Sequence, residues 1–109
     1  MVYLTNSFNI NMLGRVPAIL KVEEISLTRV KNILGSNEYV SAIGHESTAQ
    51  FLSMLLGMSI PFNRIEIKAM PGDSIIVFQI LKRLPEGKIL SMEELKSIPY
   101  RFFLVCFCS

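Results

Sequence analysis

The sequence predicts a single α/β domain, in which helices pack on a five-stranded mixed sheet. Its 109 residues are close to the commonest size of one domain. Segments of β-forming character alternate along the chain with segments whose apolar residues recur at helical spacing. Because no repeat, linker or low-complexity stretch divides the chain, we expect residues 1–109 to fold as one unit.

The first half of the chain contains both kinds of element. Residues 2–8 and 18–25 have the side-chain character of strands, and a polar connection with glycine and proline separates them. Residues 26–34 and 48–57 carry apolar side chains at helical spacing, and a glycine closes each of these segments. Residues 39–44 lead from the first expected helix into the second.

The second half begins with residues 62–68, in which two classes of side chain alternate strictly and therefore predict a strand. Residues 74–81 form a near-continuous apolar run, which is typical of a central strand buried on both faces. The one strongly polar residue of this run is Gln79, and a buried amide must either bond the backbone or reach a ligand. A short helix at 91–96 and a last strand at 100–108 complete the expected elements.

Charge and hydropathy limit what the protein can bind. The formal net charge is +2 and the pI is ≈ 8.7, which is too weak for holding long duplex DNA by bulk electrostatics but permits a small anionic ligand. Half of the residues are hydrophobic, yet no apolar run approaches the ~20 residues of a membrane-spanning helix. This apolar excess indicates a buried face between subunits. The N-terminal residues do not have the pattern of a signal peptide, so we expect a cytoplasmic protein.

The sequence does not indicate a metal site or a cofactor site. One histidine and two cysteines are too few for a zinc site, and no paired carboxylates of the kind that hold magnesium are present. A disulfide between Cys106 and Cys108 would be strained, so we expect both to pack in the core or at an interface. There is no phosphate-binding P-loop, and we expect neither a metal nor a cofactor.

His45, the only histidine, lies just before the second expected helix. Residues 47–50 (Ser-Thr-Ala-Gln) fit a capping box, which would start the helix at Ser47. The unpaired N–H groups and the positive dipole end of a helix start bind anions, usually phosphate. An imidazole beside a phosphate can act as a general acid or base without metal, with an arginine as the anion clamp. A structural cap or an ordinary surface residue is the alternative interpretation.

Other polar residues that can contact an anionic ligand lie in turns, on expected strands and in a charged loop at 82–88. Asparagine is common in turns because its side chain bonds the nearby backbone, which is an alternative to ligand contact. In the loop, an arginine and a glutamate can equally form a local ion pair, although arginine also binds phosphate bidentately. The candidates are Asn6, Asn9, Asn11, Arg64, Gln79, Arg83 and Glu86.

Several of these segments together are similar to one protein family. Across nearly the whole chain they resemble the viral ring nucleases, which are common in viruses of hyperthermophilic archaea. Members of this family are anti-CRISPR enzymes that destroy cyclic tetra-adenylate, the second messenger of type III CRISPR defence. The segments are 3–6 (Tyr-Leu-Thr-Asn), 10–13 (Ile-Asn-Met-Leu), 41–48 (Ser-Ala-Ile-Gly-His-Glu-Ser-Thr), 63–68 (Asn-Arg-Ile-Glu-Ile-Lys) and 83–90 (Arg-Leu-Pro-Glu-Gly-Lys-Ile-Leu).

The resemblance implies a homodimer in the host cytoplasm that binds the ring at its dimer interface and cleaves it without metal. It makes His45 the general acid that protonates the leaving 5′ oxygen, after the ribose 2′-OH attacks the adjacent phosphate. It makes Arg83 and Glu86 partner residues in a loop that closes over the ligand. Ring contacts are implied for Asn6, Ser47, Thr48, Arg64 and Gln79, and Asn9 and Asn11 are further candidates.

Two other functions are alternatives. A non-catalytic viral regulator would bind DNA or RNA through the sheet or a dimer cleft, using Arg64, Lys68 and Arg83. The weak net charge and the lack of a recognition-helix signature count against it. A structural virion protein would use the apolar excess for assembly, but it would leave His45 unexplained.

Overall fold

The computed structural model describes residues 1–82 and 91–109. Within this part of the chain, no helix has the length and apolar character needed to cross a membrane. The elements in chain order are β1 (Val2–Thr5), the 3₁₀ helix η1 (Ile10–Met12), β2 (Leu20–Ile25), α1 (Leu27–Ser36), β3 (Tyr39–Ala42), α2 (Glu46–Leu56), β4 (Ser74–Ile80), α3 (Met92–Lys96) and β5 (Tyr100–Phe107).

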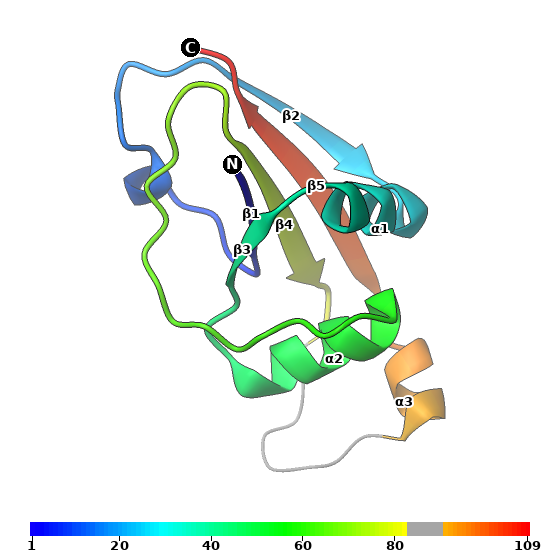
Figure 1. Cartoon of the computed structure of the whole chain (residues 1–109). Helices are drawn as coiled ribbons and strands as arrows, with labels where there is room; N and C mark the ends of the chain where they lie inside the picture. Colours follow the sequence, from blue (N-terminus) through cyan, green and yellow to red (C-terminus); the bar gives the residue numbers. More distant parts are fainter. Residues whose placement is uncertain (83–90) are drawn as a thin grey trace.

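The strands form one five-stranded sheet in the order β2-β5-β4-β1-β3, which confirms the predicted α/β class. β1 runs parallel to both of its neighbours, β3 and β4. β5 runs antiparallel to β4 and to β2, which forms the edge of the sheet opposite β3. The sheet is therefore mixed, with its parallel strands grouped at one side (Figure 1).

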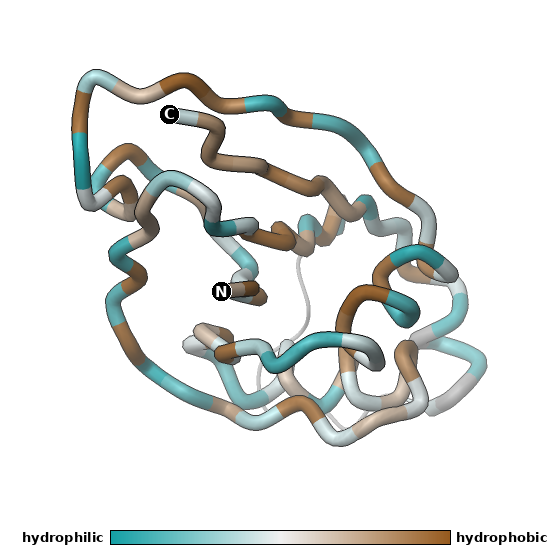
Figure 2. Tube along the Cα trace, turned by 45° about the horizontal axis from the view of Figure 1, so that its top comes forward, coloured by the Kyte–Doolittle hydropathy of each residue, from teal (hydrophilic) through white to brown (hydrophobic). Residues whose placement is uncertain are grey.

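The sequence predicted a strand at residues 62–68, and the structure has no strand there. Residues 62–68 do not pair continuously with the sheet, and Phe62 forms only an isolated bridge with Ile43. β3 instead supplies the strand beside β1. Residues 61–64 lie along the free edge of β3, and only the end of the segment lies over the second face of the sheet, where Ile67 is buried although Ile65 is 43% exposed. Figure 2 shows hydrophilic and hydrophobic residues alternating along this connection between α2 and β4.

Helices α1 and α2 cover one face of the sheet, and the main core lies between them and the strands (Figure 1). At its centre, the ring centroids of Phe78 and Phe102 are 5.1 Å apart. Phe51 of α2 and Tyr100 of β5 complete an aromatic cluster around Phe78. Large aromatic side chains dominate core energetics, so these contacts hold α2 firmly against β4 and β5.

The opposite face of the sheet is only partly covered. The connection between β1 and β2 and the connection between α2 and β4 fold over one half of it and form a smaller core that includes Ile67 and Ala69. Two backbone hydrogen bonds join these connections: the N–H of Gly14 donates to the carbonyl of Ala69, and the N–H of Ala69 donates to that of Met12, each at 2.7 Å. The other half is open, and Val22 of β2 is 59% exposed there.

Candidate functional site

Three parallel strands end at the same edge of the sheet. Thr5, the last residue of β1, lies in register with Ala42, the last residue of β3, and it also pairs with β4. Asn6 after β1, His45 shortly after β3 and Gln79 near the end of β4 therefore lie toward one edge of the sheet. In open α/β sheets, ligands bind at the carboxyl ends of the strands. This edge, at the lower side of the sheet in Figure 1, is the candidate functional site.

His45 is the N-cap residue of α2, which begins at Glu46. The expected capping box is therefore wrong, because Ser47 lies inside the first turn and not ahead of it. The first helical hydrogen bond runs from the N–H of Ala49 to the carbonyl of His45 at 3.0 Å. Tertiary contacts hold residues 41–44 and determine where the chain turns into the helix, and they outweigh a side-chain cap that contributes about 1 kcal/mol.

The start of α2 provides free backbone donors. The N–H groups of residues 46–48 precede the first helical hydrogen bond, and the His45 side chain makes no capping bond to them. His45 and Ser47 are exposed, whereas Thr48 is buried. The carboxylate of Glu46 lies in the first turn, where it interacts well with the helix dipole and competes with any anionic ligand. Because of Glu46, an anion bound at the start of α2 needs a positive charge in addition to the helix dipole.

Arg64 supplies a positive charge close to this helix start. Its Nε donates a hydrogen bond to the carbonyl oxygen of Gly44 at 3.2 Å, and Gly44 immediately precedes His45. The two terminal guanidinium nitrogens make no hydrogen bond or ion pair with any residue that the structure describes. A guanidinium with free N–H groups can bind a phosphate bidentately, so Arg64 can act as the anion clamp.

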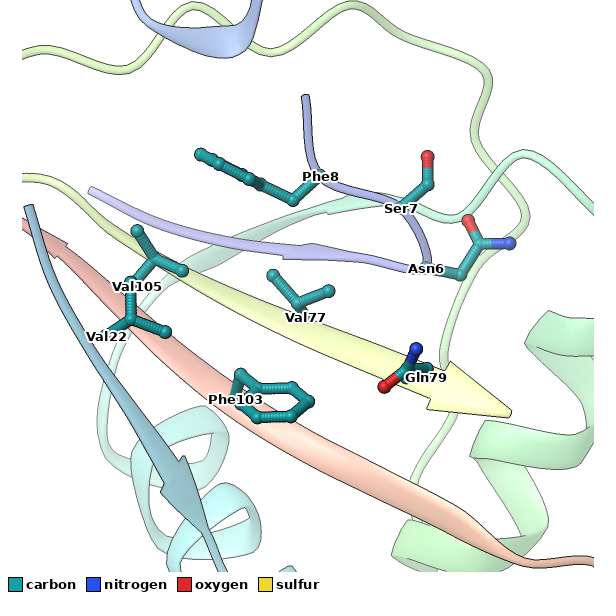
Figure 3. Close-up of a pocket in the computed structure, with 8 residues that line it drawn as sticks. All are labelled: Asn6, Ser7, Phe8, Val22, Val77, Gln79, Phe103 and Val105. Carbon is teal, nitrogen blue, oxygen red and sulfur yellow. The ribbon is translucent and has the colours of Figure 1, made fainter. Parts of the chain in front are cut away.

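Asn6 and Gln79 lie at one end of a cavity of ≈ 460 Å³ on the open half of the sheet, and Val22 and Val105 lie at its other end (Figure 3). This volume is within the range of small-molecule sites. The side chain of Gln79 is exposed, so the expectation that β4 is buried on both faces is wrong here: the smaller core does not extend to this end of β4. The lining residues are Asn6, Ser7, Phe8, Val22, Val77, Gln79, Phe103 and Val105.

A local turn determines the position of Asn6. Thr5 is buried, and its hydroxyl donates a hydrogen bond to the carbonyl of Ser7 at 2.9 Å. The N–H of Ser7 donates back to the same hydroxyl oxygen at 3.3 Å. This side-chain turn ends β1 and leaves Asn6 at the cavity.

A second hollow, of ≈ 660 Å³, follows α2 and the connection after it. Glu46 and Gln50 border it on the helix, and Met58 and Phe62 border it on the connection. His45 lines neither hollow and lies on the exposed surface at the start of α2.

The structure brings Asn9 and Asn11 neither to the residues at the start of α2 nor to the cavity that Asn6 and Gln79 line. The Asn9 side-chain oxygen accepts a hydrogen bond from the N–H of Asn11 at 2.9 Å and so caps η1. The Asn11 carbonyl accepts a hydrogen bond from Nζ of Lys68 at 2.9 Å. Both asparagines are exposed, and neither lines a cavity described above. The turn interpretation therefore accounts for Asn9, and ligand contact by either residue stays a prediction.

Arg83 and Glu86, the expected partners of His45, lie outside the described residues, as does most of the loop at 82–88. Within residues 1–82 and 91–109, no group of three or more His, Cys, Asp or Glu side chains could hold a metal ion. Cys106 and Cys108 are free thiols, half-buried and exposed respectively.

Two sets of residues near the site were not singled out from the sequence. Phe8 and Phe103 line the cavity on opposite sides (Figure 3), but their pattern alone is that of ordinary core residues. Ser41, in the segment that leads to His45, donates to the carbonyl of Pro61, and Asn63 donates to the carbonyl of Ser41. Asn63 did carry a signal, because it is a polar residue on the same side of its alternating segment as the buried Ile67.

Comparisons with known proteins find relatives over nearly the whole chain. A family model described as STIV B116-like matches residues 2–102. "Uncharacterized protein 26" of Sulfolobus islandicus filamentous virus (isolate Iceland/Hveragerdi) is 32% identical over 105 residues, which cover 95% of this chain and 89% of that protein. "Uncharacterized protein YddF" of Bacillus subtilis (strain 168) is 40% identical over 91 residues, which cover 82% and 84%. The solved structure of B116 of Sulfolobus turreted icosahedral virus matches with a TM-score of 0.84 and 33% identity, over 96% of this chain and 97% of that chain.

Proposed function

The chain belongs to the STIV B116-like family, and from that premise we propose that it is a metal-independent ring nuclease. In this proposal it cleaves cyclic tetra-adenylate and so blocks type III CRISPR defence. The relatives include proteins of archaeal viruses and of a bacterium, and their names state no activity. The activity therefore rests on the resemblance of the motifs, and the geometry around His45 supports it.

The proposed reaction is an attack by a ribose 2′-OH on the adjacent phosphorus. The 2′-O–P bond forms as the P–O5′ bond breaks, and the imidazolium of His45 gives its proton to the leaving 5′ oxygen. The 2′-OH proton passes to water or to a base, and His45 regains its proton from solvent. The products are a 2′,3′-cyclic phosphate and a 5′-hydroxyl. General acid catalysis together with a cationic clamp requires no metal for this step.

The observation that carries the proposal is the combination of two side chains with unused polar groups at the start of α2. The exposed imidazole of His45 makes no capping hydrogen bond, and the terminal nitrogens of Arg64 have no partner within the described residues. A purely structural N-cap side chain would bond the free N–H groups of the first turn. Here the side chains and the N–H groups are all left for a ligand, and an anion satisfies all three.

We propose that the active species is a homodimer. One subunit has a single histidine, and its cavity opens on an uncovered part of the sheet. A ring with four phosphates needs more cations than the described residues of one subunit offer at this edge. A second copy related by a two-fold axis adds another His45 and another Arg64, and cyclic tetra-adenylate can adopt the same two-fold symmetry.

The direct test incubates the purified protein with cyclic tetra-adenylate in excess EDTA and identifies the products by chromatography and mass spectrometry. We expect linear products that end in a 2′,3′-cyclic phosphate. Activity that disappears in EDTA and returns with magnesium or manganese would overturn the mechanism. No cleavage, combined with tight binding of duplex DNA or RNA, would favour the non-catalytic regulator instead.

A binding measurement tests which hollow receives the ring. Gln79→Ala removes an exposed amide at the ≈ 460 Å³ cavity and should weaken binding of cyclic tetra-adenylate about five- to tenfold, the effect of about one hydrogen bond. Gln50→Ala is the matched control, because Gln50 is an exposed glutamine at the second hollow. If only Gln50→Ala weakens the calorimetric affinity, the ring binds along α2 and not on the sheet.

A further inference from the structure

The segment that leads to His45 is held by the connection that follows α2. Residues 59–64 run beside residues 39–44, and hydrogen bonds between the two segments repeat along their length. At its middle, the buried Ser41 donates its hydroxyl to the carbonyl of Pro61 at 2.7 Å. β3 is an edge strand, so this connection lies along its free edge without forming a strand there.

The contacts continue up to the residue before His45. Asn63 makes two of them: its side-chain Nδ2 donates to the carbonyl of Ser41 at 2.7 Å, and its backbone N–H donates to the carbonyl of Ile43 at 2.9 Å. The next residue, Arg64, donates from Nε to the carbonyl of Gly44 at 3.2 Å. These hydrogen bonds fix the carbonyls of Ser41, Ile43 and Gly44, and His45 is the next residue in the chain.

We propose that Asn63 is a positioning residue for His45. Its two hydrogen bonds fix the backbone from which the imidazole projects, and they hold Arg64, its neighbour in sequence, against Gly44. The general acid and the anion clamp are thereby held in one geometry. This inference rests on the proposed function, because the position of His45 affects turnover only if His45 transfers a proton.

The start of α2 gives a reason why His45 needs such support. In the first turn of the helix, the N–H of Ala49 holds the carbonyl of His45, but no side-chain N-cap bond holds the imidazole. A general acid must lie within hydrogen-bond reach of the leaving oxygen. A displacement of about 1 Å from the productive geometry can lower a rate about a hundredfold.

A purely structural role for Asn63 is the competing explanation. Covering the free edge of a sheet prevents unwanted pairing with another chain, and it requires no link to catalysis. Loss of such a cover would lower thermal stability and leave the turnover of the folded protein unchanged. The test therefore needs a readout that follows His45 itself and a control that loses an equivalent hydrogen bond elsewhere.

The sharpest variant is Asn63→Asp, which keeps the shape of the side chain but cannot donate to the Ser41 carbonyl. The matched control is Asn37→Asp, because Nδ2 of Asn37 donates to the carbonyl of Ile33 at 2.8 Å at the end of α1. We expect Asn63→Asp to lower kcat for cyclic tetra-adenylate about tenfold to a hundredfold, with KM changed less than about threefold. The control is expected to keep kcat, and equal kcat values for the two variants would overturn the proposal. If Asn63→Asp does not fold, Asn63→Ala takes its place, because it loses the same side-chain bond without adding a charge.

Proton NMR separates this proposal from the proposed activity. His45 is the only histidine, so its imidazole gives an unambiguous Cε1–H signal. The wild type and Asn37→Asp are expected to show one sharp signal, and Asn63→Asp a broadened or doubled one, whether or not the ring is cleaved. An unchanged His45 signal in Asn63→Asp would overturn the positioning role. A changed signal in a protein that never cleaves the ring would support the positioning of His45 and overturn only the ring nuclease activity.

Discussion

Nε of Arg64 lies 3.2 Å from the carbonyl oxygen of Gly44, so a side chain from the connection after α2 is attached to the residue directly before His45. Arg64 and Gly44 are 20 positions apart in the sequence. The bond uses one donor of the guanidinium and leaves its terminal nitrogens without a partner among the described residues. This tertiary contact brings the guanidinium to the start of α2, where His45 and the free N–H groups of the first turn lie.

Replacement of His45 tests its proposed role as a general acid. His45→Ala should lower the rate of ring cleavage by about 10²–10⁴-fold, the usual contribution of acid–base catalysis, and should leave ring affinity nearly unchanged. His45→Gln should be equally inactive, because an amide can hydrogen-bond the leaving oxygen but cannot give it a proton. Single-turnover rates and calorimetric affinities measure the two effects separately. Full cleavage by either variant would show that His45 is structural.

The oligomeric state is measurable without a ligand. Ile10, Val16, Ile19 and Val22 are each more than half exposed, and so much exposed apolar surface is typical of an interface. Light scattering at micromolar concentration should report about twice the chain mass of 12.3 kDa. A monomer that cleaves the ring at full rate would contradict the homodimer.

Two glycines should respond in opposite ways to alanine. A Cβ at Gly14 would lie 2.9 Å from the backbone oxygen of Ala69 and 2.9 Å from Sδ of Met70, where the backbone oxygen has little freedom to move. Gly14→Ala should therefore lower the free energy of unfolding by about 1–3 kcal/mol. At Gly35, inside α1, the added Cβ would meet no atom within 4 Å beyond its chain neighbours and the backbone of its own helix, and Gly35→Ala should raise the free energy of unfolding by about 0.4–1 kcal/mol. Urea unfolding of both variants measures the difference, and effects of the same sign would contradict the packing at Gly14.

The ion pair of Arg101 and Glu24 should make stability depend on pH. The hydrogen bond from Arg101, at 3.0 Å from Nη2 to Oε1, lowers the pKa of Glu24 from its ordinary value of 4.5. Because the folded-state pKa is the lower one, this contribution is complete above pH 4.5 and disappears as the pH falls through the folded-state pKa.

The thermal midpoint of Glu24→Gln should therefore lie slightly below that of the wild type at neutral pH and converge with it in acid. Glu38→Gln is the control, since Glu38 is exposed and forms no ion pair with a described residue. A difference between wild type and Glu24→Gln that grows toward acid would contradict the assignment.

The sequence predicted the elements whose signals are local. Gly57 was expected to end the second helix, and it does so in the left-handed conformation with φ 67°. The near-continuous apolar run at 74–81 was expected to be a central strand, and β4 lies between β5 and β1. Both signals are common at such positions, but the same glycine signal was wrong at Gly35, which lies inside α1 because that helix continues to Ser36.

The predictions from sequence were wrong where contacts between segments distant in the chain decide the local structure. Strict alternation at 62–68 is compatible with a strand, but β3 already pairs with β1, and the later segment binds the β3 edge mainly through Ser41 and Asn63. The capping box at Ser47 is a valid local signal, yet contacts at residues 41–44 start α2 at Glu46. In both cases tertiary hydrogen bonds outweighed a local preference of about 1 kcal/mol.

By itself, the sequence determined the fold class, the central strand β4 and the position of the only histidine just before a helix, because apolar periodicity and residue type are properties of short segments. Only the tertiary structure decided that His45 is itself the N-cap, that Arg64 is bound to Gly44, and that Asn6 and Gln79 share one cavity. These relationships join residues far apart in the chain. They depend on which strand takes the edge of the sheet and which half of the sheet stays open, and packing determines both.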